Sequence, residues 1–189
     1  MIKNKDIQKI LNEILLFSLK KKIKLYLVGG YLRDFLLGIG KENRDLDFCL
    51  KRGAIKFAKE LSKTIKTGFV VLDREHGCCR LVKEITGKNY TFDFTDFRGR
   101  DLGEDLLHRD FTINAFAIEL ENFLKHKDLL RDIIDPYSGI RDLEKRVVRL
   151  VNEESFLEDP LRILRAFSIS GELGFKIDKK TVLLIKKYR

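Results

Sequence analysis

The stretch Leu25-Tyr26-Leu27-Val28-Gly29-Gly30-Tyr31-Leu32-Arg33-Asp34 decides the fold of this 189-residue chain. Its first four residues form an apolar run that predicts a buried strand, and residues 31–37, which are followed by Gly38, predict a short helix. A Gly-Gly turn that leads into a helix presents free backbone N–H groups to a phosphate. Gly29 and Gly30 therefore predict a phosphate-binding turn, although the pair alone also fits an ordinary tight turn.

A second strand is predicted at residues 45–50, and it begins with Asp45-Leu46-Asp47. Alternate residues of a strand point to the same face of a sheet, so both carboxylates share one face. Such a pair is unfavourable unless a cation lies between the two groups, and Mg²⁺ together with substrate phosphates is the usual cation. Asp45 and Asp47 are therefore predicted to bind Mg²⁺, and the alternative is a solvated pair at the edge of a strand.

The rest of the chain alternates between helical and extended patterns. Helices are predicted at residues 5–20, 31–37, 54–65, from 159 to 173 and from 179 to the end, strands at 23–29, 45–50, 69–72, 79–85 and 90–97, and a polar loop at 38–44. This order favours an α+β fold with a mixed sheet. A weak boundary near residue 150 divides a mixed head, residues 1–148, from a helical segment, residues 149–189.

The last predicted strand of the head carries a further carboxylate. Alternation places Tyr90, Phe92 and Phe94 on one face and Asp93 on the other, polar face. Asp93 is therefore a candidate third carboxylate, and a solvent-facing strand residue is the alternative. The aromatic residues fit core packing better than base stacking.

The composition of the chain indicates what kind of molecule it binds. The chain is 44% hydrophobic and 35% charged with a net charge of +9, which allows one compact core, and its pI is about 9.4. Its basic residues come in runs such as 20–22 and 186–187, which favours a nucleic-acid partner over charge for solubility alone. The three cysteines lack Cys-x-x-Cys spacing, which argues against a zinc site and favours reduced thiols in a cytoplasmic protein. No signal peptide or membrane-spanning run is predicted.

Four motifs, in order, resemble those of one family, the class II tRNA nucleotidyltransferases and bacterial poly(A) polymerases. They are Leu27 to Gly38 followed by Asp45-Leu46-Asp47, Arg109 to Ala115, Asp135 to Leu143, and Glu158 to Phe167. The resemblance implies a polymerase-β-like nucleotidyltransferase head with the start of a helical neck. Family members carry further helical body and tail domains that hold tRNA.

The resemblance also implies residue roles. Asp45 and Asp47 would hold two Mg²⁺ ions that activate the RNA 3′-hydroxyl and stabilise the reacting phosphates, and Asp93 stands where the family has a Glu or Asp. Arg33 would reach a phosphate from the glycine turn, or else form a surface pair with its neighbour. Arg109 matches a nucleotide-contacting arginine, but the family usually has a second arginine where this chain has His108.

Asp159, Arg162 and Arg165 are spaced i, i+3, i+6, so they lie along one side of the predicted helix. A carboxylate accepts from the exocyclic amine of cytosine or adenine, and an arginine donates to ring acceptors. The resemblance assigns base selection to Asp159 and Arg162, and a position nearer the phosphates or sugar to Arg165. The alternatives are a helix salt bridge and, for Asp159, a simple N-cap.

The expected function is template-independent transfer of CMP, with AMP as a possible second unit, from NTP to the 3′ end of tRNA. The short segment between Asp93 and Arg109 favours CC addition, because A-adding relatives carry a longer loop there. The alternatives are a poly(A) polymerase, which would use ATP and generic RNA ends, and a non-catalytic RNA-binding module. Because most of the neck, body and tail is absent, we expect tRNA grip to need further domains or a partner.

Overall fold

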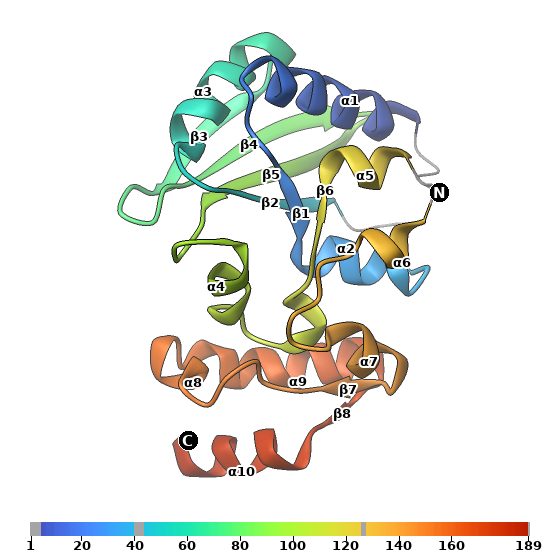
Figure 1. Ribbon diagram of the computed structural model, residues 1–189, viewed down its shortest axis with the longest axis vertical. Helices are drawn as coiled ribbons and strands as arrows, with labels where there is room; N and C mark the ends of the chain where they lie inside the picture. Colours follow the sequence, from blue (N-terminus) through green and yellow to red (C-terminus); the bar gives the residue numbers. More distant parts are fainter. Residues whose placement is uncertain (1–4, 40–43, 126–127, 189) are drawn as a thin grey trace.

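The computed structural model describes residues 5–39, 44–125 and 128–188, so most of the predicted loop at 38–44 lies outside the described residues. Its centre is a six-stranded sheet with the order β3-β4-β5-β2-β1-β6 (Figure 1). The strands are β1 (Tyr26–Val28), β2 (Asp45–Leu50), β3 (Gly68–Asp73), β4 (Cys78–Ile85), β5 (Lys88–Asp96) and β6 (Ala117–Glu119). The β2–β5 pair is parallel and the other neighbours are antiparallel, so the predicted mixed sheet is confirmed.

Helices surround this sheet and continue beyond it. They are α1 (Lys5–Lys20), α2 (Gly29–Leu36), α3 (Ala54–Ile65), α4 (Leu102–Leu107), α5 (Leu120–Lys125), α6 (Leu129–Asp132), α7 (Gly139–Glu144), α8 (Ser155–Glu158), α9 (Leu161–Leu173) and α10 (Lys179–Tyr188), with a 3₁₀ turn at Thr112–Asn114. The predicted bounds of α1 and α3 are confirmed. The strand predicted at 23–29 is shorter, because Gly29 and Gly30 already belong to the first turn of α2.

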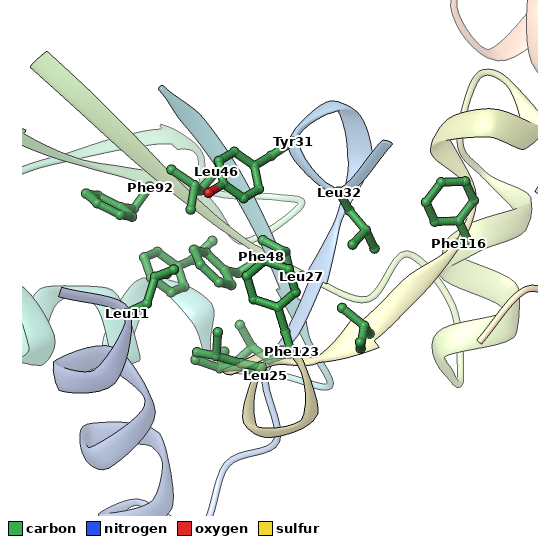
Figure 2. Packing of buried hydrophobic residues seen from close by; sticks show 14 of the residues in the cluster. Leu11, Leu25, Leu27, Tyr31, Leu32, Leu46, Phe48, Phe92, Phe116 and Phe123 are labelled. Carbon is green, nitrogen blue, oxygen red and sulfur yellow. The ribbon is translucent and has the colours of Figure 1, made fainter. Parts of the chain in front are cut away.

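The two faces of the sheet have different environments. The face with Phe48 and Phe94 packs against α1 and α3, and the two rings stack at a centroid distance of 5.1 Å (Figures 1 and 2). Burial of such rings is the main stabilising contribution in a domain of this size. On the opposite face, Cys49 of β2 packs with Leu106 of α4. Asp45 and Asp47 belong to this second face.

The C-terminal elements are tied to the head. A short strand β7 (Val147–Val148) pairs in parallel with β8 (Lys176–Ile177), so the segment predicted to be all-helical also contains a two-residue strand. Helix α9 begins at Leu161 and not at the predicted residue 159, because Pro160 is its N-cap, and Asp159 Oδ1 accepts from the Leu161 N–H at 2.9 Å. The helix ends at Leu173, and its C-cap Gly174 lies in the left-handed region. The division at residues 148/149 stays a prediction.

Within the described ranges, every helix is too short or too polar to cross a lipid bilayer.

Candidate active site

Three carboxylates lie on the second face of the sheet. Strands β2 and β5 pair Asp47 with Asp93 and Asp45 with Thr91. Paired residues on neighbouring strands point to the same face, so the structure brings together Asp45, Asp47 and Asp93, which we call the carboxylate cluster. The Thr91 hydroxyl also donates to Asp45. The predicted position of Asp93, on the strand beside the Asp45–Asp47 pair, is confirmed.

The pKa of Asp47 lies well above the ordinary value of an aspartate. Burial raises the pKa of Asp47 to about 6, and repulsion from Asp93 and Asp45 acts in the same direction, while Arg109 and Arg80 act in the opposite direction. Ionisation of Asp47 is therefore unfavourable without additional positive charge. A cation bound beside Asp47 would supply that charge.

The start of α2 lies directly against Asp47. Gly29 has a φ of +74°, and a Cβ placed there would come within 2.7 Å of Asp47 Oδ2. Gly30 is less restricted, since its Cβ would lie 3.6 Å from Arg33 Nη2, an ordinary contact. The N-cap residue of α2 is Val28, whose apolar side chain makes no capping hydrogen bond. The backbone donors of a helix start and the carboxylate cluster are therefore adjacent, which suits binding of a phosphate together with a metal ion.

Arg33 lies inside the protein and does not extend from the surface of α2. Its Nε donates to Asp34 Oδ1 at 2.7 Å and its Nη1 donates to Asn114 Oδ1 at 2.9 Å. Asn114 in turn donates to Asp110 Oδ1 at 3.0 Å. In this conformation Arg33 links α2 to the turn at 112–114, and the surface pair considered from sequence is a buried contact.

Arg109 is close to the carboxylate cluster. Its Nη2 donates to the buried Asp105 at 3.1 Å, and its charge is the largest influence lowering the pKa of Asp47. Its Nε is buried and has no hydrogen-bond partner among the described residues. The structure therefore brings Arg109 to the same site as Asp47. The neighbouring His108 pairs with Glu158 Oε1 at 3.0 Å.

Arg162 of α9 is buried and points into the junction between the head and α8. It donates to the His108 carbonyl at 2.7 Å, to the Ser155 carbonyl at 3.2 Å and to Glu158 Oε2 at 3.2 Å. Asp159 precedes α9 and is half-buried. The donors of Arg162 are thus used by the protein itself in this conformation.

Arg165 is more exposed and is held by the head. It donates from Nε and Nη2 to Oδ2 of the buried Asp110 at 2.9 and 2.7 Å. The charges of Asp159 and Asp47 both act on Arg165 and favour its charged form. Arg162 and Arg165, which we call the arginine face of α9, thus both contact the head, Arg162 at the His108 carbonyl and Arg165 at Asp110.

Sequence reasoning missed one residue of this site, Arg80 on β4. Its Nε and Nη2 each donate to Asp93, both at 2.7 Å. The sequence contains a turn pattern from which this contact could have been predicted. Thr86 and Gly87, both with positive φ, form the turn between β4 and β5, and counting outwards from this turn pairs Arg80 with Asp93.

The contacts of the carboxylate cluster limit which of its members could hold a metal ion. In the part of the chain that the structure describes, no three Asp, Glu, His or Cys side chains converge as a metal site. Asp93 faces Arg80, which leaves Asp45 and Asp47 as the two carboxylates that could share a cation. Hard oxygen donors next to a phosphate-binding helix start suit a divalent ion such as Mg²⁺.

The chain is similar in sequence and in fold to known tRNA-processing enzymes. The chain is 37% identical over 161 residues to a CC-adding tRNA nucleotidyltransferase of Synechocystis sp., covering 85% of this chain and 36% of the relative. It is also 37% identical over 177 residues to an A-adding tRNA nucleotidyltransferase of Aquifex aeolicus, covering 87% and 20%. The structure of the Thermotoga maritima CCA-adding enzyme complexed with tRNA matches with a TM-score of 0.81 at 31% identity, over 98% of this chain and 42% of that one.

The fold is thus that of a nucleotidyltransferase head, the class that the sequence resemblance implied. Residues 25–149 match the family described as the poly A polymerase head domain, and the chain belongs to this family. The matched regions leave more than half of each of the three relatives uncovered.

Proposed function

We propose that this chain is the catalytic head of a template-independent nucleotidyltransferase that transfers CMP from CTP to the 3′ end of tRNA. Residues 1–148 would form the head and residues 149–189 the start of a neck. The observation that carries the proposal is the carboxylate cluster in contact with the helix start at Gly29. This arrangement can hold the triphosphate and the charge that develops on it at one place.

Asp45 and Asp47 are the proposed metal-binding residues, and Asp93 is the third carboxylate beside them. The residues fit Mg²⁺, because Asp47 is enclosed with two further carboxylates nearby and its ionisation is favoured by a cation close to it. A bound divalent ion would supply Lewis-acid stabilisation of charge on the reacting phosphate. The protein contributes the orientation of both carboxylates through the pairing of β2 with β5.

The backbone N–H groups at Gly29 and Gly30 are proposed to hold phosphate oxygens. Arg33 fixes α2 in place through Asp34 and Asn114, and it would contact phosphate only after exchanging one of these partners. Arg109 lies next to Asp47, and its buried Nε has no hydrogen-bond partner among the described residues, so we assign it a contact with the nucleotide.

Base selection is assigned to Asp159 and Arg162, with Arg165 closer to the phosphates or sugar. A carboxylate just before a helix and a guanidinium in its first turn can recognise the amine and the ring acceptors of cytosine without a template. Arg162 is occupied by Glu158 and the His108 carbonyl, so recognition would require it to exchange one of these partners.

CC addition is favoured by the short connection between β5 and α4. Asp101 caps α4 by accepting from the Glu104 N–H at 3.0 Å, and Arg100 pairs with Glu104. These contacts, all within the connection and the first turn of α4, hold the connection in a compact conformation. Because the three relatives described above have three different named specificities at similar identity, overall likeness does not select among them.

Two further expectations complete the proposal. The tRNA body would be held by additional domains or a partner, since the matched region covers less than half of each relative. A cytoplasmic location is supported by the three cysteines, all of which are free.

The test is extension of a tRNA transcript that lacks its 3′ CCA, with Mg²⁺ and each NTP singly, and then with CTP plus ATP. High tRNA concentration compensates for weak binding. Growth by two nucleotides with CTP alone is the expected result. Growth by three with both nucleotides would revise the specificity to CCA addition, and long tails from ATP would instead indicate a poly(A) polymerase.

The control is the Asp45→Asn/Asp47→Asn double variant, which keeps the shape of both side chains. It should be inactive, and it should lose any Mg²⁺-dependent thermal stabilisation by CTP, because ligand binding to the folded state raises its stability by mass action. Absence of both extension and CTP-dependent stabilisation in the unmodified chain would overturn the catalytic assignment.

A further inference from the structure

Three charged side chains form a row across three neighbouring strands of the sheet. The antiparallel β4–β5 register pairs Arg80 with Asp93, and the parallel β5–β2 register pairs Asp93 with Asp47. Neighbouring strands are about 4.8 Å apart, so the row places one positive charge beside two negative charges. Figure 1 shows β4, β5 and β2 running side by side in the sheet.

Arg80 and Asp93 form a bidentate ion pair at one end of this row. Arg80 Nε donates to Asp93 Oδ1 and Arg80 Nη2 donates to Asp93 Oδ2, both at 2.7 Å. The Asp93 side chain is only 17% exposed, whereas the Arg80 side chain is 38% exposed. Arg80 also interacts favourably with the charges of Asp45 and Asp47. The charge of Arg80 therefore acts on all three residues of the carboxylate cluster, whereas an isolated surface pair involves only one carboxylate.

The same contact limits what Asp93 can do. Both of its oxygens accept from Arg80, so Asp93 cannot direct both towards a cation while this pair persists. Positive charge on Arg80 also opposes entry of a second cation at Asp45 and Asp47. Arg80 and a divalent ion therefore compete for the same negative charge.

We propose that Arg80 is a positioning residue that acts as the internal counter-cation of the carboxylate cluster. It holds Asp93 beside Asp47 while no metal is bound, and a metal ion recruits Asp93 as a further ligand only by displacing Arg80 from it. The inference rests on the proposed function for the assignment of Asp45 and Asp47 as metal ligands. Its consequence is that the head can fold without metal, at the expense of metal affinity.

Binding of Mn²⁺, measured by calorimetry or electron spin resonance in the absence of nucleotide, tests the competition. We expect Arg80→Gln to bind Mn²⁺ about three- to tenfold more tightly than the unmodified chain, because the opposing charge is removed and Asp93 is released. The Arg80→Gln/Asp93→Asn double variant should lose this gain. Unchanged or weaker binding by Arg80→Gln would overturn the proposal, since a purely structural role predicts that outcome.

The matched control is Arg100→Gln. Arg100 forms the same kind of pair with Glu104, but its side chain is 90% exposed and lies on the connection to α4. The substitution removes one positive charge and one arginine–carboxylate pair without touching the row. We expect its Mn²⁺ affinity to equal that of the unmodified chain.

Thermal unfolding in EDTA tests the same proposal without metal or activity. Arg80→Gln should lower Tm by about 3–8 °C, because it leaves Asp93 and Asp47 side by side without the charge that pairs with Asp93. Adding Asp93→Asn to it should restore part of the loss. A double variant that is less stable than Arg80→Gln would contradict the counter-cation role. If this cycle behaves as expected while the unmodified chain binds no Mn²⁺, the proposed function fails and the ion-pair role of Arg80 stands.

Discussion

The carboxylate cluster and the arginine face of α9 are held in place by different kinds of interaction. Asp45, Asp47 and Asp93 are positioned by the backbone pairing of β2 with β5, which fixes their spacing and their common face. Arg162 and Arg165 are positioned by side-chain contacts with the head, namely the His108 carbonyl and Asp110. Backbone pairing leaves little freedom, whereas side-chain contacts can be exchanged. The chemistry of the site therefore has a rigid part and an adaptable part.

This difference matches the two tasks of the proposed function. In that function the geometry of metal and triphosphate would be the same for each nucleotide added, so a rigid sheet suits it. Base selection needs side chains that can change partners, and the donors of Arg162 contact Ser155, Glu158 and His108. The comparison predicts that variants in the sheet affect catalysis regardless of the nucleotide, while variants in α9 affect which nucleotide is used.

The largest effect is expected for Asp47→Asn. This change should lower nucleotide transfer by at least about 100-fold with every NTP, because it removes a charged ligand at the proposed metal site. It should also raise Tm at neutral pH, since ionised Asp47 is unfavourable in the folded state. The measurement is tRNA extension beside thermal unfolding, with Asp128→Asn, an exposed residue before α6, as the charge-matched control. Activity that survives in Asp47→Asn would remove Asp47 from the site.

Gly29→Ala tests whether the rigid part depends on close backbone approach. The new Cβ would lie 2.7 Å from Asp47 Oδ2 at a φ of +74°, so we expect a loss of stability of about 1–3 kcal/mol and a strong loss of transfer. Gly30→Ala is the matched control, since its Cβ meets Arg33 at an ordinary 3.6 Å. Denaturant unfolding of both variants gives the comparison, and equal stabilities would show that Asp47 moves aside easily.

Much of the rigid part could be predicted from sequence, because it depends on local patterns. The spacing of Asp45 and Asp47 and the alternation around Asp93 both follow from strand geometry and were confirmed. The parallel pairing that places Asp93 opposite Asp47 depends on a long crossover through α3, β3 and β4, which no local pattern specifies. Arg80 was missed although the Thr86–Gly87 turn fixes its register with Asp93.

The adaptable part was harder to predict for a physical reason. The spacing correctly placed Arg162 and Arg165 on one helix, but Asp159 lies before that helix, at the C-cap of α8. Spacing also does not show which partners the arginines choose. The contact of Arg162 with the His108 carbonyl joins residues 54 positions apart, and that of Arg165 with Asp110 joins residues 55 apart. Such partners depend on the packing of α8 and α9 against the head, and so on the complete fold.

A comparison of Arg162→Gln with Arg165→Gln sharpens the role of α9. Arg162 is 6% exposed and donates to backbone carbonyls, so its loss should destabilise the protein by about 2–3 kcal/mol. The Arg165 side chain is 57% exposed, but its partner Asp110 is buried, so its loss should cost about 1–2 kcal/mol. In extension assays with competing CTP and UTP, Arg162→Gln should lose more selectivity than Arg165→Gln. The reverse order of selectivity would assign base reading to Arg165.

The smallest expected effect is a dependence of stability on pH that arises at Asp47. Its pKa is about 6 in the folded protein, which is above the ordinary value of 3.8, so the folded state binds this proton more tightly than the unfolded state. The contribution of protonated Asp47 to stability is therefore present at low pH and is lost as pH rises through about 4 to 6. In EDTA, the unmodified chain should lose about 2 kcal/mol relative to Asp47→Asn between pH 4 and pH 7.

The Asp47→Asn variant serves as the reference in this experiment, because an asparagine side chain does not titrate while every other group is shared. Added Mg²⁺ should reduce the difference at pH 7, since a cation beside Asp47 favours its ionised form and replaces the missing positive charge. A difference that grows in favour of the unmodified chain as pH rises would mean that Asp47 is stabilised as a carboxylate by the protein alone. In that case Arg80 and Arg109 would already satisfy the carboxylate cluster, and the electrostatic reason for a metal ion there would disappear.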